Sequence, residues 1–385
     1  MTPVDIAIVG WASATLGTSA YALLRALLRG RPPRSLPEMP AGKVLLIRPC
    51  AGDEASLAHT LGSTVLAGDI ERSRVVFAIG HHGDPSRPAA ERARDRLRAA
   101  GVEAHVEITS AHGLNHKVAQ LSRALARHGD GCDYVVVADS DVDLSGVPLR
   151  ELIAPIAPGS PAGAAWSPVV ESPFAPTFAD RLSQVVLGGS LHAFPVLAEL
   201  DPRTMVGKLF AIRLDALEAV GGLRSLEAFL GEDAELSRRL RAAGIGVVAT
   251  RVTAVARTAG RSLGAVVGRF ARWITVVRAQ RPGLLPTYPL LFCALPCVLL
   301  AAWLAGASAV SALGAFALVL AGRGLAAAAA IRRAPSERFV GAPWWWLAAD
   351  LVLLAAFARA LATRTVSWRG RDLLVGRRGV LELTS

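Results

Sequence analysis

The chain has 385 residues, 52% of them apolar, and a mean hydropathy of +0.40. That length allows one large or two ordinary domains, and the hydropathy is high for a purely soluble protein. The formal charge of +11 would suit a nucleic-acid-binding protein, but the arginines cluster beside long apolar segments. We therefore expect a membrane protein that does not bind nucleic acid.

The N-terminal segment is the first candidate span. Residues 6–28 are long enough to cross a bilayer, and they lack a basic leader and a clear cleavage site. We predict a retained N-terminal transmembrane anchor over residues 1–30. Four arginines flank it, and an excess of positive charge marks the cytoplasmic side of a span. The domain that follows should therefore face the cytoplasm, in a bacterial-type inner membrane.

The middle of the chain, residues 43–280, has ordinary globular composition. Apolar runs at 43–50, 73–84, 102–108 and 134–141 alternate with segments of helical periodicity. This alternation predicts an α/β domain with a mostly parallel, doubly wound sheet. In such sheets ligands bind at the carboxyl ends of the strands, where we expect Arg48, Asp84, Asp139 and Asp141.

Two further segments of the middle region are amphipathic. Residues 181–200 are apolar but interrupted by Gln, His, Gly and Pro, and residues 262–280 carry Arg269 and Arg272 on one face. We predict that both are membrane-surface helices.

The stretch "VVVADSDVDL" (residues 135–144) begins as an apolar run and then carries three carboxylates at alternate positions. Asp139 and Asp141 are two residues apart, and such a pair can share a hard cation, Mg²⁺ or Mn²⁺, against a diphosphate. The alternative is a turn that is merely rich in Asp. We expect Asp143, which lies beyond the pair, to be a turn carboxylate. Asp233 begins the helix predicted over 231–244, where an Asp is either a helix cap or a catalytic group.

The C-terminal region, residues 284–362, contains two segments of spanning length, 284–306 and 311–330, and a weaker one at 344–362. Four full spans would leave the basic tail, 363–385, outside the cell, against the positive-inside tendency. Either the last segment does not fully cross or the tail is an exception.

Arg323 and Asp350 lie at similar depths in two of these segments, so we predict that they pair. Cysteines in the cytoplasmic domain should be free thiols.

Four motifs in order resemble those of the ceramide glucosyltransferase group of inverting glycosyltransferases (families 2 and 21), which includes lipid glycosyltransferases of the hopanoid type. The motifs are "HHGDPS" with Asp84, "ADSD" with Asp139 and Asp141, "GEDAEL" with Asp233, and "RFARW" with Arg269, Arg272 and Trp273. "GLNHKVAQL", "VGKLFAIRLDALEAVGG" and "SWRGRDLLV" also resemble family segments. The similarity runs from Lys43 to the C-terminus.

The resemblance implies a GT-A nucleotide-sugar-binding fold and a UDP-sugar donor. It implies that Asp139 and Asp141 bind the metal and that Asp233 is the general base. It implies that Arg269, Arg272 and Trp273 close over the donor. The donor would be bound by Arg48, Glu54, Asp84, Lys117 and Asp139.

The acceptor implied is a hydroxyl of a membrane lipid, such as ceramide, a hopanoid or a diacylglycerol. The sugar would be a hexose of the glucose or N-acetylglucosamine type. The alternatives are a polyprenyl-phosphate or polysaccharide-synthase-type glycosyltransferase and a non-catalytic nucleotide-sugar-binding membrane protein.

The positions of the lysines independently favour two of these family-like segments as parts of the site. Only three of the 42 basic residues are lysine, at positions 43, 117 and 208, and two of them lie in family-like segments. Lysine is a compact, flexible cation that suits a phosphate oxygen.

Overall fold

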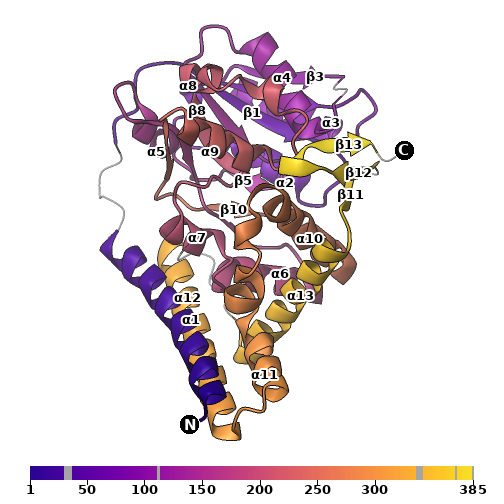
Figure 1. Ribbon diagram of the computed structural model, residues 1–385. Coiled ribbons are helices and arrows are strands. Elements are labelled where there is room, and N and C mark those ends of the chain that lie inside the picture. Colours follow the sequence, from indigo (N-terminus) through magenta and orange to yellow (C-terminus); the bar gives the residue numbers. More distant parts are fainter. Residues whose placement is uncertain (30–36, 111–112, 335–340, 369–370, 384–385) are drawn as a thin grey trace. The chain divides into compact units, whose positions relative to one another are not determined.

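The computed structural model describes residues 1–29, 37–110, 113–334, 341–368 and 371–383 (Figure 1). It forms two compact units. The apolar unit comprises Met1–Arg31, Ala175–Leu200 and Gly260–Val366, and the sheet unit comprises Pro32–Phe174, Asp201–Ala259 and Ser367–Ser385. This division differs from the predicted domain 43–280, because both segments predicted as membrane-surface helices cluster with the apolar helices.

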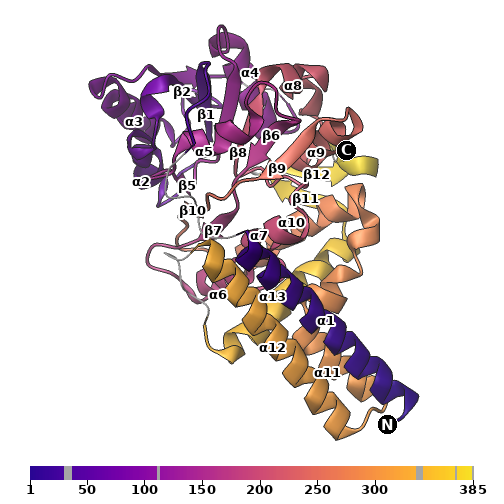
Figure 2. The same cartoon turned by 90° about the vertical axis from the view of Figure 1, so that its left-hand side faces the viewer.

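The sheet unit contains a seven-stranded sheet in the order β3-β2-β1-β4-β8-β6-β9. Figure 2 shows β2, β1, β8, β6 and β9 in this order. The strands are β1 (Val44–Cys50), β2 (Ser73–Ile79), β3 (Ala104–Ile108), β4 (Tyr134–Ala138), β6 (Ala162–Trp166), β8 (Leu209–Arg213) and β9 (Gly246–Ala249). The first four are parallel, β8 is antiparallel to both of its neighbours, and β9 is parallel to β6. The predicted mostly parallel α/β fold is confirmed.

The central strands are apolar except for Arg48 in β1, because neither face of the sheet is left to solvent. Every residue of β1 and of β4 is buried, as is typical of parallel strands covered on both sides. The helices of this unit are α2 (Leu57–Gly62), α3 (Arg87–Ala99), α4 (His116–His128), α5 (Leu149–Ile153), α8 (Leu214–Ala219) and α9 (Glu232–Ala242).

A second, small sheet follows the end of β4. It consists of β5 (Val142–Asp143), β10 (Ala254–Ala256) and β7 (Val169–Glu171), with β10 in the middle. Since β5 begins four residues after β4 ends, the intervening turn with Asp139 and Asp141 is fixed at both ends.

The basic tail is structured, which the sequence analysis did not predict. It forms β11 (Thr365–Trp368), β12 (Arg371–Val375) and β13 (Leu381–Leu383) in one three-stranded sheet. The amide of Leu381 donates to the carbonyl of Ala228 (2.7 Å), and that of Leu230 donates to the carbonyl of Gly379 (2.9 Å). The tail therefore pairs with the segment just before α9.

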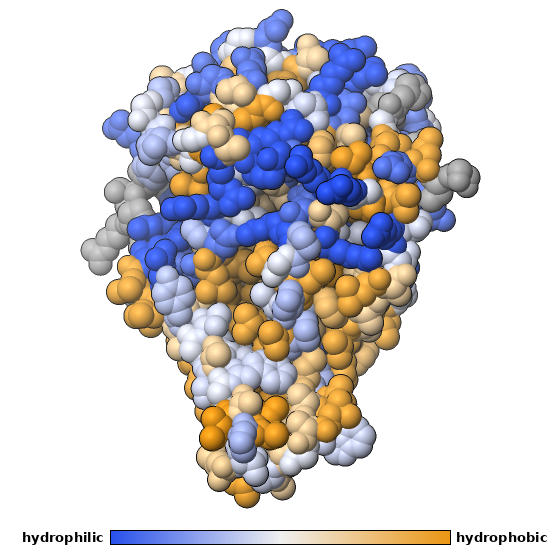
Figure 3. Space-filling model, viewed as in Figure 1, coloured by the Kyte–Doolittle hydropathy of each residue, from blue (hydrophilic) through white to orange (hydrophobic). Residues whose placement is uncertain are grey.

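Among the residues that the structure describes, the apolar unit contains three helices that are long and apolar enough to cross a membrane: α1 (Pro3–Leu28), α12 (Ala309–Arg333) and α13 (Pro343–Ala362). A fourth candidate is the pair Pro282–Phe292 and Ala294–Leu304 (α11), which is bent by 83°. Apolar side chains cover much of this unit's visible surface (Figure 3). Its exposed apolar residues include Leu300, Trp303, Leu304, Val310 and Leu313.

The remaining helices of the apolar unit are α6 (Phe178–Gly189), α7 (Phe194–Leu200) and α10 (Leu263–Gln280). The segment predicted as one helix over 181–200 is thus two helices, separated at Ser190. In α10 the residues Val266, Phe270 and Ile274 are fully buried, as its amphipathic pattern predicts.

The predicted pair of intramembrane charges is confirmed. A guanidinium nitrogen of Arg323 lies 3.0 Å from a carboxylate oxygen of Asp350, and both side chains are buried. All four cysteines are free, including Cys50 and Cys132 of the sheet unit, for which this was expected.

Candidate active site

The turn after β4 holds the two carboxylates of the "ADSD" motif. Hydrogen bonding of β4 to β8 ends where the amide of Asp139 donates to the carbonyl of Lys208 (2.8 Å). Asp139 and Asp141 therefore lie at the carboxyl end of a buried strand, where α/β sheets bind ligands.

Arg48 fixes this turn from beneath. Its side chain is fully buried, and one terminal nitrogen donates to the carbonyls of Asp139 (2.9 Å), Ser140 (3.3 Å) and Val142 (2.5 Å). The other donates to the carbonyl of Thr60 and the hydroxyl of Thr64. Burial lowers the pKa of Arg48 to about 10, so it stays charged at neutral pH. Its guanidinium is directed at protein carbonyls that shape the turn.

Lys117 connects the metal motif to the Glu-Asp pair. Its ammonium lies 2.8 Å from Asp139, 3.1 Å from Glu232, and 2.9 Å from the carbonyl of Gly207, to which it donates. Although burial disfavours its charged form, the two carboxylates hold the pKa of Lys117 well above its ordinary value.

Asn115 places Lys117 by capping α4. Its side-chain oxygen accepts from the amide of Val118, and its side-chain nitrogen donates to the carbonyl of Phe229 (2.7 Å) and to Glu232 (3.2 Å). The start of α4 and the segment before α9 are thereby held together.

Asp233 lies in the first turn of α9, half-buried. One oxygen accepts from the amide of Gly207 (2.7 Å) and the other from the amide of Ala234 (2.8 Å). Burial and the neighbouring charge of Glu232 raise the pKa of Asp233 to about 6, against the opposing effect of Lys117. A carboxylate with this pKa is ionised at neutral pH and is a better base than an ordinary Asp.

The dipeptide Gly207–Lys208 contacts both the metal motif and the Glu-Asp pair. Gly207 contacts Asp233 through its amide, and the ammonium of Lys208 pairs with Asp141. A Cβ atom on residue 207 would lie 3.0 Å from that of Asp233, so a larger residue at this position would displace the Asp233 side chain.

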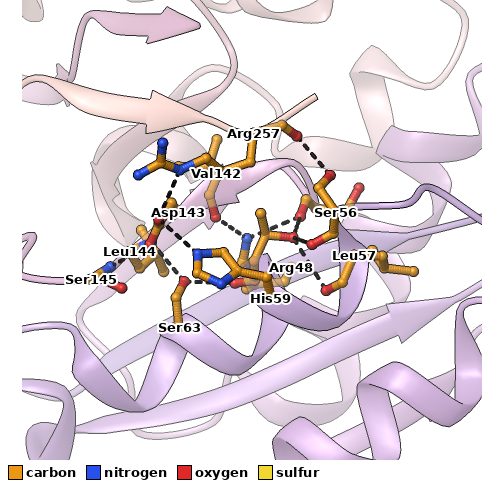
Figure 4. A network of polar contacts seen from close by, with 12 residues as sticks. Arg48, Ser56, Leu57, His59, Ser63, Val142, Asp143, Leu144, Ser145 and Arg257 are labelled. Atoms are coloured by element: carbon orange, nitrogen blue, oxygen red, sulfur yellow. Dashed lines mark hydrogen bonds and ion pairs between the residues drawn. The ribbon is translucent and has the colours of Figure 1, made fainter. Parts of the chain in front are cut away.

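Asp143 accepts from the following turn, as expected, and it also contacts two more distant residues. Figure 4 shows it facing His59 and Arg257. One oxygen lies 3.1 Å from His59 and 3.1 Å from Arg257, and the other accepts from the amide of Ser145. Although burial acts in the opposite direction, these contacts hold the pKa of Asp143 well below its usual range. Asp143 therefore joins β5 to α2 and β10.

Asp84 and Glu54 lie in loops that follow β2 and β1. Asp84 is buried, and one of its oxygens accepts from the amides of Gly52 and Ser86 and from the hydroxyl of Ser86. Glu54 is exposed. Asp84 thus ties the two loops together, and the role of both residues toward the donor stays a prediction.

The "RFARW" residues lie in the apolar unit, on α10. The guanidinium of Arg269 lies 5.0 Å from the ring of Trp273 and also contacts the hydroxyl of Ser183. Trp273 stacks on His192 and lies against Phe194. Arg272 is half-buried on the same helix.

The donor set of the turn fits a hard divalent cation. Asp139 and Asp141 present carboxylate oxygens, and one oxygen of Asp141 is buried without a hydrogen-bond partner among the described residues. Within the described ranges no group of three or more His, Cys, Asp or Glu side chains gathers to hold a metal. Further ligands would have to come from a donor phosphate or water, as Mg²⁺ sites on phosphate substrates commonly do.

Of the residues in this network, Lys117 was predicted from sequence as a site residue, whereas Lys208, Gly207, Glu232 and Asn115 were not. The scarcity of lysine marked Lys208. The roles of Gly207 and Asn115 rest on backbone contacts between segments about 90 to 115 residues apart in sequence.

The chain is similar to known proteins in sequence family and in fold. The family model described as "Glycosyl transferase family 21" matches residues 6–381. A search of the curated proteins found no match.

Among solved structures, the mannosyltransferase PcManGT from Pyrobaculum calidifontis, in complex with GDP-Man and Mn²⁺, is 18% identical with a TM-score of 0.50. The match covers 93% of this chain and 99% of that one. Glucosyl-3-phosphoglycerate synthase from Mycobacterium tuberculosis, with Mn²⁺ and UDP, is 18% identical with a TM-score of 0.37, over 64% of this chain and 85% of that one. Both are GT-A glycosyltransferases. The match over nearly the whole chain shows that this protein belongs to glycosyltransferase family 21.

Proposed function

We propose that the protein is an inverting hexosyltransferase that moves a sugar from a UDP-sugar to a hydroxyl of a membrane lipid, such as ceramide or a hopanoid. The observation that carries the proposal is the shared network of the two carboxylate groups. Lys117 contacts Asp139 and Glu232, and residues 207–208 contact Asp233 and Asp141. A metal-binding pair and a candidate base therefore belong to one site.

Asp139 and Asp141 would hold Mg²⁺ or Mn²⁺. When bound, such an ion neutralises charge on the diphosphate and stabilises it as a leaving group. Lys117 adds a cation beside Asp139, suited to a phosphate oxygen. Asp84, Glu54 and Arg48 would complete the donor site, Arg48 by holding the turn.

Asp233 would take the proton of the acceptor hydroxyl. The hydroxyl oxygen then bonds to the anomeric carbon as the bond from that carbon to the diphosphate oxygen breaks, and UDP leaves with the electron pair. One displacement needs one base, so the configuration inverts. Arg269, Arg272 and Trp273 would close over the donor.

A lipid acceptor is supported by composition. The chain that carries these carboxylates also carries three helices able to span a membrane, and amphipathic helices α6 and α10. A polysaccharide synthase usually has more spans, and a non-catalytic protein would be free to lose Asp139, Asp233 and Arg272.

The test uses membranes that contain the full chain. They are incubated with a panel of UDP-sugars, with GDP-mannose as comparison, and a bacterial lipid extract, and products are identified by mass spectrometry. We expect one UDP-sugar to yield a glycolipid and EDTA to abolish the product. Transfer from GDP-mannose alone, or undiminished activity in EDTA, would contradict the proposal.

The Asp233→Asn variant tests the base. It should bind UDP as the wild type does and lose about 10²- to 10⁴-fold in turnover, the usual contribution of a general base. Near-normal turnover would remove Asp233 from this role.

A further inference from the structure

Lys208, like Lys117, is a largely buried lysine that pairs with a carboxylate of the metal motif. Its ammonium pairs with Asp141, and its side chain is only 13% exposed. Its own carbonyl accepts from the amide of Asp139, so its backbone is fixed directly beside the metal motif. The fixed backbone and flexible side chain allow the ammonium to exchange partners without any change in the strand.

The pair is not needed to hold the turn. Arg48 already binds three of the turn's carbonyls, and β4, β5 and β8 fix its backbone. Structural ion pairs elsewhere use arginine, as in Arg150–Asp69, Arg261–Asp180 and Arg323–Asp350. Arginine binds a carboxylate through a rigid fork, whereas lysine is a point charge that is released more readily.

The charges of the site point to exchange. The carboxylates of Asp139, Asp141, Glu232 and Asp233 face the ammonium groups of Lys117 and Lys208. A divalent cation would neutralise the remaining charge, and the donor would then bring its diphosphate charge into the same place. An ammonium displaced from Asp141 by the metal would find an anionic partner in that diphosphate.

We propose that Lys208 competes with the divalent metal for Asp141 and, once released, binds the diphosphate of the sugar donor. The proposal rests on the proposed function, since it assumes a metal and a nucleotide-sugar at this turn. It adds Lys208 to the residues that bind substrate. Loss of the Lys208 side chain should then strengthen metal binding and weaken donor binding.

The experiment measures two affinities on the full chain purified in detergent. Mn²⁺ binding without nucleotide is followed by electron paramagnetic resonance, and UDP binding at saturating Mn²⁺ by calorimetry. Lys208→Met removes the charge and keeps the length. Lys43→Met makes the same change at an exposed lysine at the start of β1 and should alter neither affinity.

For Lys208→Met we expect Mn²⁺ to bind several-fold tighter, because its competitor is gone. UDP should bind about tenfold weaker, the order expected for one lost charge-assisted contact. Lys208→Arg should weaken Mn²⁺ binding, because the guanidinium holds Asp141 more firmly. The Mn²⁺ affinity would then rise in the order Arg, Lys, Met, which a purely structural ion pair does not produce.

The outcomes separate the two proposals. A wild type that binds Mn²⁺ and UDP, with a Lys208→Met variant in which both affinities fall or neither moves, overturns the role of Lys208 alone. A wild type that binds no UDP in the presence of Mn²⁺ overturns the proposed function and this inference with it. If Lys208→Met does not fold, the Lys208→Arg arm still decides, since unchanged or tighter Mn²⁺ binding contradicts the competition.

Discussion

Arg48 is the residue on which the metal-binding turn depends most. It donates to four carbonyls and one hydroxyl while fully buried. Lysine has three donors and no planar fork, so Arg48→Lys leaves buried carbonyls unsatisfied. We expect the free energy of unfolding to fall by about 2–4 kcal/mol and Mn²⁺ affinity to fall as the turn loosens.

Denaturant unfolding of the purified chain measures the first effect. Arg94→Lys is the control, because Arg94 pairs with the largely exposed Asp95 and such pairs contribute about 0–1 kcal/mol. Equal losses for both variants would show that Arg48 has no special role in the turn.

Asp233 gives the transfer reaction a defined pH dependence. Its pKa is raised to about 6 by burial and by Glu232. A base acts when deprotonated, so kcat/KM should rise with pH and level off above about 6. Glu232→Gln removes the neighbouring negative charge, so the midpoint should move to lower pH.

Rates across pH 4.5–8 measure this shift, and an unmoved midpoint in Glu232→Gln would argue that Asp233 is not the titrating base. The same raised pKa has the opposite effect on folding. Because folded Asp233 binds its proton more tightly than an unfolded Asp, its contribution to stability is present below about pH 4 and is lost as pH rises through about 6.

At the residue scale, the positions of Asp139, Asp141 and Asp233 followed from local pattern, since a strand end and a helix start are visible in sequence. Asp143 and Lys208 did not follow. Their partners, Arg257 and Asp141, come from segments about 114 and 67 residues away in sequence, and no local periodicity encodes which carboxylate a side chain meets.

At the element scale, the bent pair Pro282–Phe292 and Ala294–Leu304 is a break in an apolar segment. Backbone groups freed by such a break require protein partners at membrane depth. The carbonyl of Leu290 accepts from Trp11 (2.6 Å) and Thr15, and the amide of Leu295 donates to Asp350 (3.3 Å). Side chains of helices α1 and α13 therefore supply hydrogen-bond partners for the backbone groups at the break.

Asp350 thus has two tasks, as partner of Arg323 and as acceptor for Leu295. Arg323→Asp or Asp350→Arg alone should cost about 3–5 kcal/mol, because each leaves buried like charges. The double reversal should recover the ion pair but not the bond to Leu295, so rescue should be partial.

The yield of monodisperse protein in detergent and its thermal unfolding temperature measure this order. A double variant no better than either single variant would show that the pair is not the stabilising feature. Full rescue would show that the bond to Leu295 contributes little.

The alternation of strands and helices was predictable because each element buries its own apolar pattern. The break at Ser190 and the strands of the tail were not. Residues 379–381 pair with residues 228–230 through backbone hydrogen bonds, and a backbone pairing between segments about 150 residues apart in sequence leaves no periodic signal in either one.

At the scale of the whole molecule, the long helices α1 and α12 begin near each other and end near each other. The amide of Ser308 donates to Asp5 (2.9 Å) at one end, and Arg29 and Arg333 both contact the buried Glu199 at the other. Arg29 leads within a few residues into the sheet unit. Helix α12, which precedes α13, therefore ends beside the end of α1 from which the chain continues into the sheet unit.

The tail that leaves α13 pairs with residues 228–230 of that same unit, so we expect both flanks of α13 to lie on one side of the membrane. We predict that α13 does not complete a crossing, although its length and hydropathy would allow one, and that the arginine-rich tail accords with the positive-inside tendency. A fluorescent protein fused after residue 385 should fluoresce and alkaline phosphatase fused there should be inactive. Phosphatase fused after Gly306, beside the Asp5 end, should be active. Active phosphatase after residue 385 would mean that α13 spans the membrane. It would also mean that the tail does not pair with residues 228–230 when the protein is inserted in a membrane.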